Sequence, residues 1–531
     1  MTYDYIIIGS GFGGSVSAMR LSEKGYKCLV IEKGKRFQQN DFPKSDWQAS
    51  KYLWMPALRF FGLMKLTFFK EVLVISGTGV GGGSLIYANT HIFPPDAFFN
   101  NAVWAKYKNW KEVLAPFYER ARFMLGSTQV KKMHKEDEVL REIAQDMGRG
   151  DTFEMVDVGV YFGDTKAETD PYFKGNGPLR KGCIECSACM TGCRYNAKNT
   201  LDKNYLYFAQ KWGTEVLAET LATKIEFING EYHIHVESST GFFWNKQKRV
   251  LKAKGLVVSG GVLGTMELLL KQKYHFNTLP NLSDTLGENL RTNSESIAGL
   301  INANVPLNHG PAITSVFNAD EHTHIEVVKY GAQAGLITKL ASLSTDGFTS
   351  WARSWHFVKK VIKQPFTFLK VTTQPFFGNN SLILLVMQSL DNALKMEWKK
   401  GIFGGKMRFA KNGATIPAYI PTGQDVLYRY AEKVGGTPLN SATETFLNMS
   451  TTAHVLGGCP MGETAETGVV NQFFEVNNYP NMYILDGSII PCNLGVNPSL
   501  SITALSEYAM DNVREKEGNT QVSLVTQMNA D

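Results

Sequence analysis

A glycine-rich turn near the amino terminus is the feature that most restricts the fold of this chain. Gly9, Gly11 and Gly14 form the pattern GxGxxG directly after the apolar run 5–8 and directly before a stretch with helical spacing at 15–24. The first glycine makes the turn, the second lets the backbone approach a pyrophosphate, and the third lets helix and strand pack closely. The pattern therefore predicts a parallel βαβ unit that binds a dinucleotide at the amino terminus of its helix.

An acidic residue narrows the choice of dinucleotide. The second apolar run, 26–32, ends in Glu32, at the offset where a carboxylate accepts hydrogen bonds from the adenosine ribose. A carboxylate at this position disfavours the ribose phosphate of NADP. FAD and NAD share the fingerprint, so the choice between them depends on the rest of the chain.

The carboxy-terminal part favours the flavin. A strand-like run ends at Asp486 and Gly487, and the sequence around Asn497 and Pro498 opens a helix, with the proline at its expected first position. The unpaired N–H groups of such a helix start suit the negative charge that develops on the N1–C2=O side of a reduced flavin. A nicotinamide has no such need.

Composition excludes several classes of protein. The 531 residues are 44 % apolar and 20 % charged, as in ordinary globular proteins, and the net charge of +6 is too diffuse to predict nucleic-acid binding. The amino terminus lacks the basic region of a signal peptide, and no run of 18 apolar residues occurs. We expect a cytoplasmic or peripheral membrane protein.

Two kinds of strand pattern predict the fold class, which is α/β. Residues 256–273 suggest a second strand–glycine–helix unit, whereas 300–440 alternates between polar and apolar residues, as antiparallel strands do. We expect a Rossmann-like FAD-binding domain made of residues 1–300 and 441–531, which contains a Cys-rich loop at 180–195. An inserted α+β, mainly antiparallel, substrate-binding domain would span 301–440.

Five motifs together resemble the glucose-methanol-choline (GMC) oxidoreductase family, and most closely its bacterial cholesterol-oxidase branch. They are GSGFGGS from Gly9, GTGVGGGSL from Gly77, VSGGVLGTMEL from Val258, HVLGGCPMG from His454 and GVNP from Gly495. The resemblance spans nearly the whole chain and implies bound FAD. It also implies that the flavin is lined by the glycine-rich run, namely Gly77, Gly81, Gly82, Gly83 and Ser84. Thr78 and Tyr87 depart from the common family pattern, which leaves the covalent or non-covalent state of the flavin open.

The same resemblance supplies three candidate catalytic residues. His454 would take or share the hydroxyl proton of an alcohol while its carbon gives a hydride to flavin N5, a role that suits the pKa of histidine. Asn497 would be a second hydrogen-bonding residue, although an Asn before Pro498 is also a natural helix cap. Glu326 resembles the base that shifts a steroid double bond, but a surface glutamate is the alternative there.

A cysteine run suggests a metal centre. Cys183, Cys186, Cys189 and Cys193 have a CxxCxxCxxxC spacing close to that of ferredoxins, so the run predicts one iron–sulfur cluster or one zinc ion. In ferredoxins the fourth cysteine of such a run serves a second cluster, and this chain has no second run. A set of redox-sensitive thiols is the alternative.

Two segments that combine aromatic and basic residues, 51–70 and 351–363, suit either a lid or lipid-contacting surface or ordinary packing helices. A bulky apolar alcohol such as a sterol would account for both. The sequence is compatible with three functions. We expect a sterol-oxidising flavoenzyme that uses oxygen or an electron carrier; the alternatives are an iron–sulfur flavoprotein dehydrogenase of another alcohol and a non-catalytic flavoprotein that binds lipid or membranes.

Overall fold

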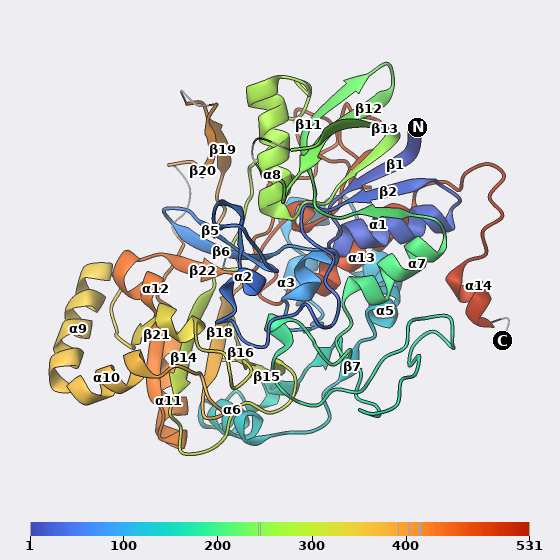
Figure 1. The fold of residues 1–531 in the computed structure, drawn as a ribbon. Coiled ribbons are helices and arrows are strands. Elements are labelled where there is room, and N and C mark those ends of the chain that lie inside the picture. Colours follow the sequence, from blue (N-terminus) through green and yellow to red (C-terminus); the bar gives the residue numbers. More distant parts are fainter. Residues whose placement is uncertain are drawn as a thin grey trace.

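Two large β-sheets organise the chain (Figure 1). The computed structural model describes residues 2–242, 244, 246–390, 392–401, 404–411 and 416–529. The first sheet is mainly parallel around its centre and the second is antiparallel, which confirms the predicted α/β class with an antiparallel second part. The predicted domain boundaries at 300/301 and 440/441 stay a prediction.

The amino-terminal βαβ unit forms as the glycine pattern predicts. Strand β1 (Thr2–Ile8) leads through the glycine turn into helix α1 (Phe12–Glu23), and β2 (Cys28–Ile31) pairs in parallel with β1. Both strands are almost wholly buried, as expected for a parallel sheet covered on both faces.

Strand β13 (Lys248–Val258) is the centre of the first sheet because three strands pair with it. It pairs in parallel with β1 along one edge; along the other edge it pairs first with β12 (Glu231–Ser238) and then, in parallel, with β23 (Met482–Ile484). The carboxyl ends of β1, β13 and β23 therefore meet at one edge. The sheet is completed by β10 (Glu215–Leu217) beside β2 and by β11 (Thr220–Ile228) beside β12.

Helices cover this sheet. α1 packs on α13 (Ser499–Asp511) and on α7 (Tyr205–Lys211), and α13 also packs on α5 (Trp110–Leu125). A buried guanidinium–carboxylate pair joins α1 to α13, since Nε of Arg20 lies 2.7 Å from Oε2 of Glu507. α8 (Val262–Lys271) follows β13 directly.

The second sheet is built from strands that lie between β8 and β21, and every pairing in it is antiparallel. Its order is β17 (Ala341–Leu343), β21 (Thr437–Ser441), β14 (Ser296–Ile301), β18 (Leu382–Gln388), β16 (Thr323–Val328), β15 (Ile313–Asn318) and β8 (Glu154–Met155).

One face of the second sheet packs on helices, and the other face lines a cavity. Leu384 and Val386 of β18 pack in a buried cluster with helices α6 (Lys135–Asp146) and α11 (Pro421–Val434). Ile383 and Leu385 alternate with them and therefore point to the opposite face. That opposite face looks towards the glycine turns of the first sheet, since both line one cavity.

A small sheet and a helical hairpin complete the parts that matter for function. β22 (Ser450–Thr452), β6 (Val72–Gly77) and β5 (Met64–Phe68) form a three-stranded sheet. The aromatic-basic segment 51–70 forms mostly short strands and turns, whereas 351–363 lies in helix α9 (Ser350–Lys363), which is followed by α10 (Pro365–Thr373). None of the helices that the structure describes is long and apolar enough to cross a membrane.

The remaining helices and strands are short. They are α2 (Ala49–Tyr52), β3 (Trp54–Met55), β4 (Phe60–Phe61), α3 (Asp96–Phe99), α4 (Ala102–Ala105), β7 (Thr128–Gln129), β9 (Asp157–Val158), β19 (Met396–Lys399), β20 (Lys406–Phe409), α12 (Ala442–Leu447) and α14 (Leu524–Asn529).

A glycine in α1 gives a direct test of this packing. A Cβ added at Gly13 would lie 1.7 Å from the carbonyl oxygen of Leu485, which is backbone and cannot swing away. We expect Gly13→Ala to lower the free energy of unfolding by about 1–3 kcal/mol, as other overpacked substitutions do. Urea unfolding would measure this.

The matched control is Gly264→Ala in α8, because no atom lies within 4 Å of a Cβ added there. Alanine in an open helical position should raise stability by up to about 1 kcal/mol. Equal effects of the two substitutions would contradict the packing of α1 against the end of β23.

Candidate active site

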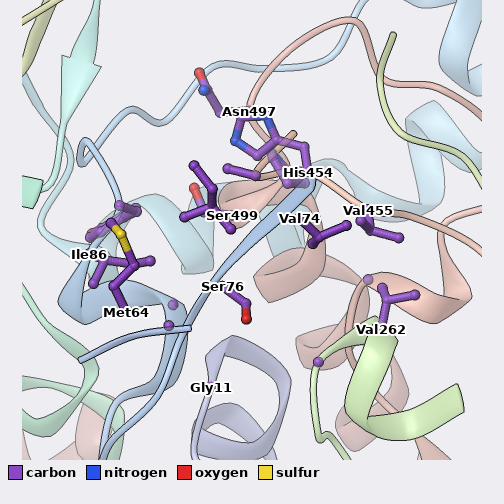
Figure 2. A pocket seen from close by; sticks show the side chains of 18 of the residues that line it. Gly11, Met64, Val74, Ser76, Ile86, Val262, His454, Val455, Asn497 and Ser499 are labelled. Carbon is purple, nitrogen blue, oxygen red and sulfur yellow. The ribbon is translucent and has the colours of Figure 1, made fainter. Parts of the chain in front are cut away.

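A cavity of about 330 Å³ lies where the first sheet's glycine turns face the second sheet. Figure 2 shows Gly11 at one end and His454 and Asn497 at the other. Segments from the whole length of the chain line it, so the cavity exists only in the folded protein. Its main lining residues are Gly11–Gly13, Lys33, Met64, Ser76, Gly77, Gly83, Ile86, Ser259–Gly264, Ile297, Ile313, Val328, Tyr330, Ile337, Ile383, Leu385, Ala453–Val455, Asp486, Gly487 and Asn497–Ser499.

The amino-terminal glycines divide into packing and lining positions. A Cβ at Gly9 would lie 2.1 Å from the carbonyl oxygen of Ser259, and one at Gly14 would lie 2.1 Å from that of Gly9. Gly11 instead faces the cavity, with no atom within 4 Å of an added Cβ, and no side chain caps the start of α1. This is the arrangement that a pyrophosphate needs.

Glu32 lies beside this turn but outside the cavity lining. Its carboxylate accepts hydrogen bonds from the hydroxyl of Ser10 at 2.8 Å and from the backbone N–H of Gly34 at 2.8 Å. Contact with a ribose stays a prediction. Two cations that the sequence reasoning did not single out, Lys33 and Lys65, line this part of the cavity. Burial, and then the charge of Lys65, lower the pKa of Lys33 to about 8.

The glycine-rich run that begins at the end of β6 also contains both lining and packing positions. Gly77 and Gly83 line the cavity, whereas Gly82 packs on the turn, since a Cβ there would lie 2.6 Å from Cα of Gly11. Ser84 points away: its hydroxyl donates to the carbonyl of Gly81 at 2.7 Å and accepts from the N–H of Leu201 at 3.1 Å. Ser84 and Gly81 therefore stabilise the loop without lining the cavity.

The end of β23 and the start of α13 form the opposite wall. Asp486 and Gly487 line the cavity, and burial raises the pKa of the Asp486 carboxyl. Helix α13 begins one residue later than expected: Pro498 takes the cap position and no side chain caps the helix. The side chain of Asn497 is therefore not a cap. It donates from Nδ2 to Glu326 at 3.3 Å, and its Oδ1 is buried without a hydrogen-bond partner.

His454 lines the cavity and is held by a buried acid. Its Nδ1 pairs with Oε1 of Glu295, whose other oxygen accepts the N–H of Ala453 at 2.8 Å. Because a carboxylate only accepts hydrogen bonds, this contact places the proton of the neutral imidazole on Nδ1. Nε2 is then the nitrogen that can receive a proton from a bound molecule.

The electrostatics of this pair favour the charged imidazole. Burial by itself lowers the pKa of His454, but the carboxylate of Glu295, and then that of Glu326, outweigh burial and raise it above the ordinary 6.5. Glu295 is fully buried, so little solvent screens the interaction. The site is therefore built to stabilise an imidazolium that forms by proton uptake.

Glu295 was not predicted from the sequence. Its position is fixed by the residues that precede it in the chain. Asn293 and Ser294 before it have φ angles of 57° and 47°, in the left-handed region. The side chain of Asn293 donates to the carbonyl of Val496 at 3.1 Å and accepts from the N–H of Gly495 at 2.9 Å. The loop that carries Glu295 is thus bonded to the loop that carries Asn497. A buried acid at the start of a strand has no distinctive spacing in the sequence.

Glu326 is buried in β16 and belongs to the site. Val328, two residues further on the same strand, lines the cavity, so both side chains point to the same face. Oε2 accepts from Asn497, while Oε1 has no hydrogen-bond partner and lies 3.4 Å from Nε2 of His324. The structure thus places Glu326 beside Asn497 and within electrostatic reach of His454.

The wall beyond these polar groups is apolar. It comes from the inner face of the second sheet and the segments next to it, and few polar atoms interrupt it. Such a space favours a large hydrocarbon skeleton over a hydrated sugar. The residues that form this wall are Ile86, Ile297, Ile313, Val328, Ile337, Ile383 and Leu385.

The four clustered cysteines surround a second, much smaller pocket of about 20 Å³, room for about one water molecule. All four are free, and within the described ranges no group of three or more His, Cys, Asp or Glu side chains is placed to hold a metal ion. Burial raises the pKa of Cys186 to about 11, whereas the nearby Lys203 and backbone N–H groups offset burial and lower that of Cys193. The arrangement does not fit the predicted iron–sulfur cluster on Cys183, Cys186, Cys189 and Cys193.

The fit of a flavin dinucleotide is good by contrast. One continuous cavity joins the open glycine turn at Gly11 to the uncapped start of α13, and the unpartnered Oδ1 of Asn497 lies at that end. Gly11–Gly13, Gly77, Gly83, Asp486, Gly487 and Asn497–Ser499 would hold it.

The chain is similar to known proteins in sequence and in fold. The family model described as GMC oxidoreductase matches residues 414–506, and one described as NAD(P)-binding Rossmann-like domain matches residues 7–38. A cholesterol oxidase of Acinetobacter baumannii is 40% identical over 529 residues, covering 97% of this chain and 95% of the relative. A cholesterol oxidase of Mycobacterium tuberculosis is 40% identical over 524 residues, covering 96% and 90%. The fold also matches the crystal structure of pyridoxine 4-oxidase from Mesorbium loti, with a TM-score of 0.62 at 15% identity, covering 96% of this chain and 99% of that one.

The pairing of His454 with Glu295 predicts a titration shift. In Glu295→Gln the imidazolium loses its main anionic partner while the shape of the side chain is kept. We expect the pKa of His454 to fall, so that its NMR titration in isotope-labelled protein moves to lower pH. Because the neutral imidazole is the proton acceptor, the acidic limb of the pH–activity profile should move the same way.

Glu444→Gln is the matched control. Glu444 is also buried, and burial raises its pKa to about 8, but it bonds Ser296 and Ile297 and not His454. The titration of His454 should be unchanged in this variant. An unshifted His454 in Glu295→Gln would show that the pair does not control the histidine.

Proposed function

The chain belongs to the GMC oxidoreductase family, as an FAD-dependent oxidoreductase acting on CH–OH groups, and from this premise we propose that its substrate is a sterol or related 3-hydroxysteroid. The observation that carries the proposal is the apolar wall beside His454 and Asn497. A rigid, bulky hydrocarbon with one hydroxyl group matches a cavity with polar groups at one end only. Cholesterol oxidases among the relatives support the same substrate class.

His454 acts as the proton acceptor in this proposal. A bound flavin would supply the acceptor for the hydride of the carbinol carbon, and we propose that molecular oxygen is the final electron acceptor. Nε2 of His454 takes the hydroxyl proton, so that the alcohol becomes a ketone, and Glu295 stabilises the resulting imidazolium. A charge-stabilised proton acceptor is needed because an alcohol is a very weak acid.

Asn497 orients the hydroxyl group. One N–H of its amide donates to Glu326, which leaves the second N–H for the substrate oxygen. His454 and Asn497 then hold the hydroxyl from two sides, which fixes the direction of the C–H bond that must break. The surrounding apolar residues exclude water, so these few hydrogen bonds act at low local dielectric.

Glu326 gives the site a further capacity. A sterol ketone with a neighbouring double bond can isomerise when a carboxylate moves a proton between two ring carbons. Glu326 is fully buried and Oε1 has no hydrogen-bond partner, as such a base requires. We therefore propose that the enzyme both oxidises and isomerises. An iron–sulfur dehydrogenase is disfavoured, because the cysteine pocket, within the residues that the structure describes, does not fit a cluster.

Anaerobic flavin reduction tests the substrate proposal. Detergent-dispersed cholesterol should bleach the flavin absorbance of the purified holoenzyme, and glucose, a hydrated alcohol of similar hydroxyl chemistry, should not. In His454→Ala the rate of bleaching should fall by about a hundredfold or more, with flavin still bound. Bleaching by glucose but not by cholesterol would reject the sterol as substrate.

Glu326→Gln tests the isomerase step separately. The amide keeps the size of the side chain and its hydrogen bond to Asn497 but cannot accept a ring proton. We expect oxidation to continue while the unconjugated ketone accumulates, which the absence of enone absorbance would report. Conjugated product formed at the parental rate would exclude Glu326 as the base.

A further inference from the structure

Helix α9 presents an apolar stripe to solvent. Trp351, Trp355, Val358 and Ile362 follow one another at intervals of four, three and four residues, the spacing of one helix face. All four are exposed, with Trp351 at 76% and Ile362 at 74%. A second side of α9, with Phe357 and Val361, packs inward. The helix is therefore apolar on two sides, and one of them faces solvent.

Helix α10 extends this surface. Phe366 is 85% exposed, and Leu369, one turn further, is also exposed. Pro365 ends α9 and starts α10, so the two helices form a hairpin at the outer edge of the second sheet (Figure 1). Contiguous apolar surface of this kind marks a site of interaction with a protein or a membrane.

The charge of the hairpin indicates which partner fits. Residues 347–390 contain no Asp or Glu, whereas Lys359, Lys363 and Lys370 are exposed on the hairpin. The ammonium group of Lys359 lies 5.2 Å from the ring of Trp355, so cation and aromatic ring share one surface. Tryptophan with lysine beside an apolar stripe is typical of helices that lie in the interface of an anionic bilayer.

The inner side of the hairpin leads to the cavity. Phe357 and Val361 of α9 and Val371 of α10 pack in one apolar cluster with Tyr330, Ile337 and Ile383. These last three residues also line the cavity. The exposed stripe and the apolar wall of the cavity are thus two sides of the same layer of side chains.

We infer that the α9–α10 hairpin docks this protein on the surface of an anionic phospholipid bilayer, with its exposed apolar stripe inserted among the acyl chains and its lysines against the headgroups. The helices lie in the interface plane. Only the role of this docking rests on the proposed function: it would bring the cavity to a membrane that contains the apolar alcohol.

Vesicle cosedimentation of the flavin-loaded protein tests the docking without turnover. Vesicles of phosphatidylcholine and phosphatidylglycerol in equal parts should carry the protein down, and added salt should weaken this. The variant Trp351→Ser/Ile362→Ser/Phe366→Ser should stay in the supernatant. Lys359→Gln/Lys363→Gln/Lys370→Gln should lose about fivefold in partitioning per lysine on the anionic vesicles.

Leu179→Ser/Val525→Ser is the control, because it removes two apolar side chains that are more than half exposed elsewhere on the surface. It should bind like the parent. No binding by the parent, or equal binding by the serine hairpin variant, would overturn the inference. Dimers in solution that the hairpin substitutions dissociate, without vesicle binding, would also overturn it and make the hairpin an interface between copies.

Flavin bleaching by detergent-dispersed cholesterol separates this inference from the proposed function. Because detergent replaces the membrane, the serine hairpin variant should bleach at the parental rate. Vesicle binding without bleaching by any sterol would leave the docking in place and reject the substrate. Bleaching by cholesterol without vesicle binding would support the substrate and reject the docking.

Discussion

The parallel pairing of β13 with both β1 and β23 is the constraint on which the active site depends. It brings Ile8, Val258 and Ile484, which are hundreds of residues apart in the chain, to one edge of the sheet. The turns that follow these strands supply Gly11, the 259–264 segment and Gly487 to one cavity. Because a Cβ at Gly9 or Gly13 would collide with the backbone that directly follows β13 or β23, this convergence requires glycine in the turn and at the start of α1.

The chemistry depends on acids that the fold keeps away from water. Glu295 holds His454, and Glu326 holds Asn497, so each residue expected to touch the hydroxyl group has a buried carboxylate behind it. The two carboxylates act together on the histidine, and both raise its pKa. The hydrogen bonds of Asn293 to Gly495 and Val496 keep the two halves of this network in register.

Much of the fold could be predicted because its signals are local. The glycine turn, the helix after it and the antiparallel strands within 300–440, which include β16 and β18, were predicted, since each depends on periodicity and turn chemistry within a short stretch. The aromatic-basic segment 51–70 was harder, because the same composition suits a packing helix and the short strands that it forms. The ferredoxin-like spacing of the cysteines misled, because spacing does not state whether four thiols converge on a metal-sized space.

The site illustrates the same limit. His454, Asn497 and Glu326 stand in recognisable motifs, so the amino-acid sequence alone was enough to single them out and to predict a dinucleotide next to them. Glu295, the side chain that selects the tautomer of His454, stands in no motif. The sequence also did not decide whether Asn497 caps α13 or bonds Glu326. Folding settled both, because a hydrogen bond between residues 159 or 171 positions apart exists only once two sheets have brought them into contact.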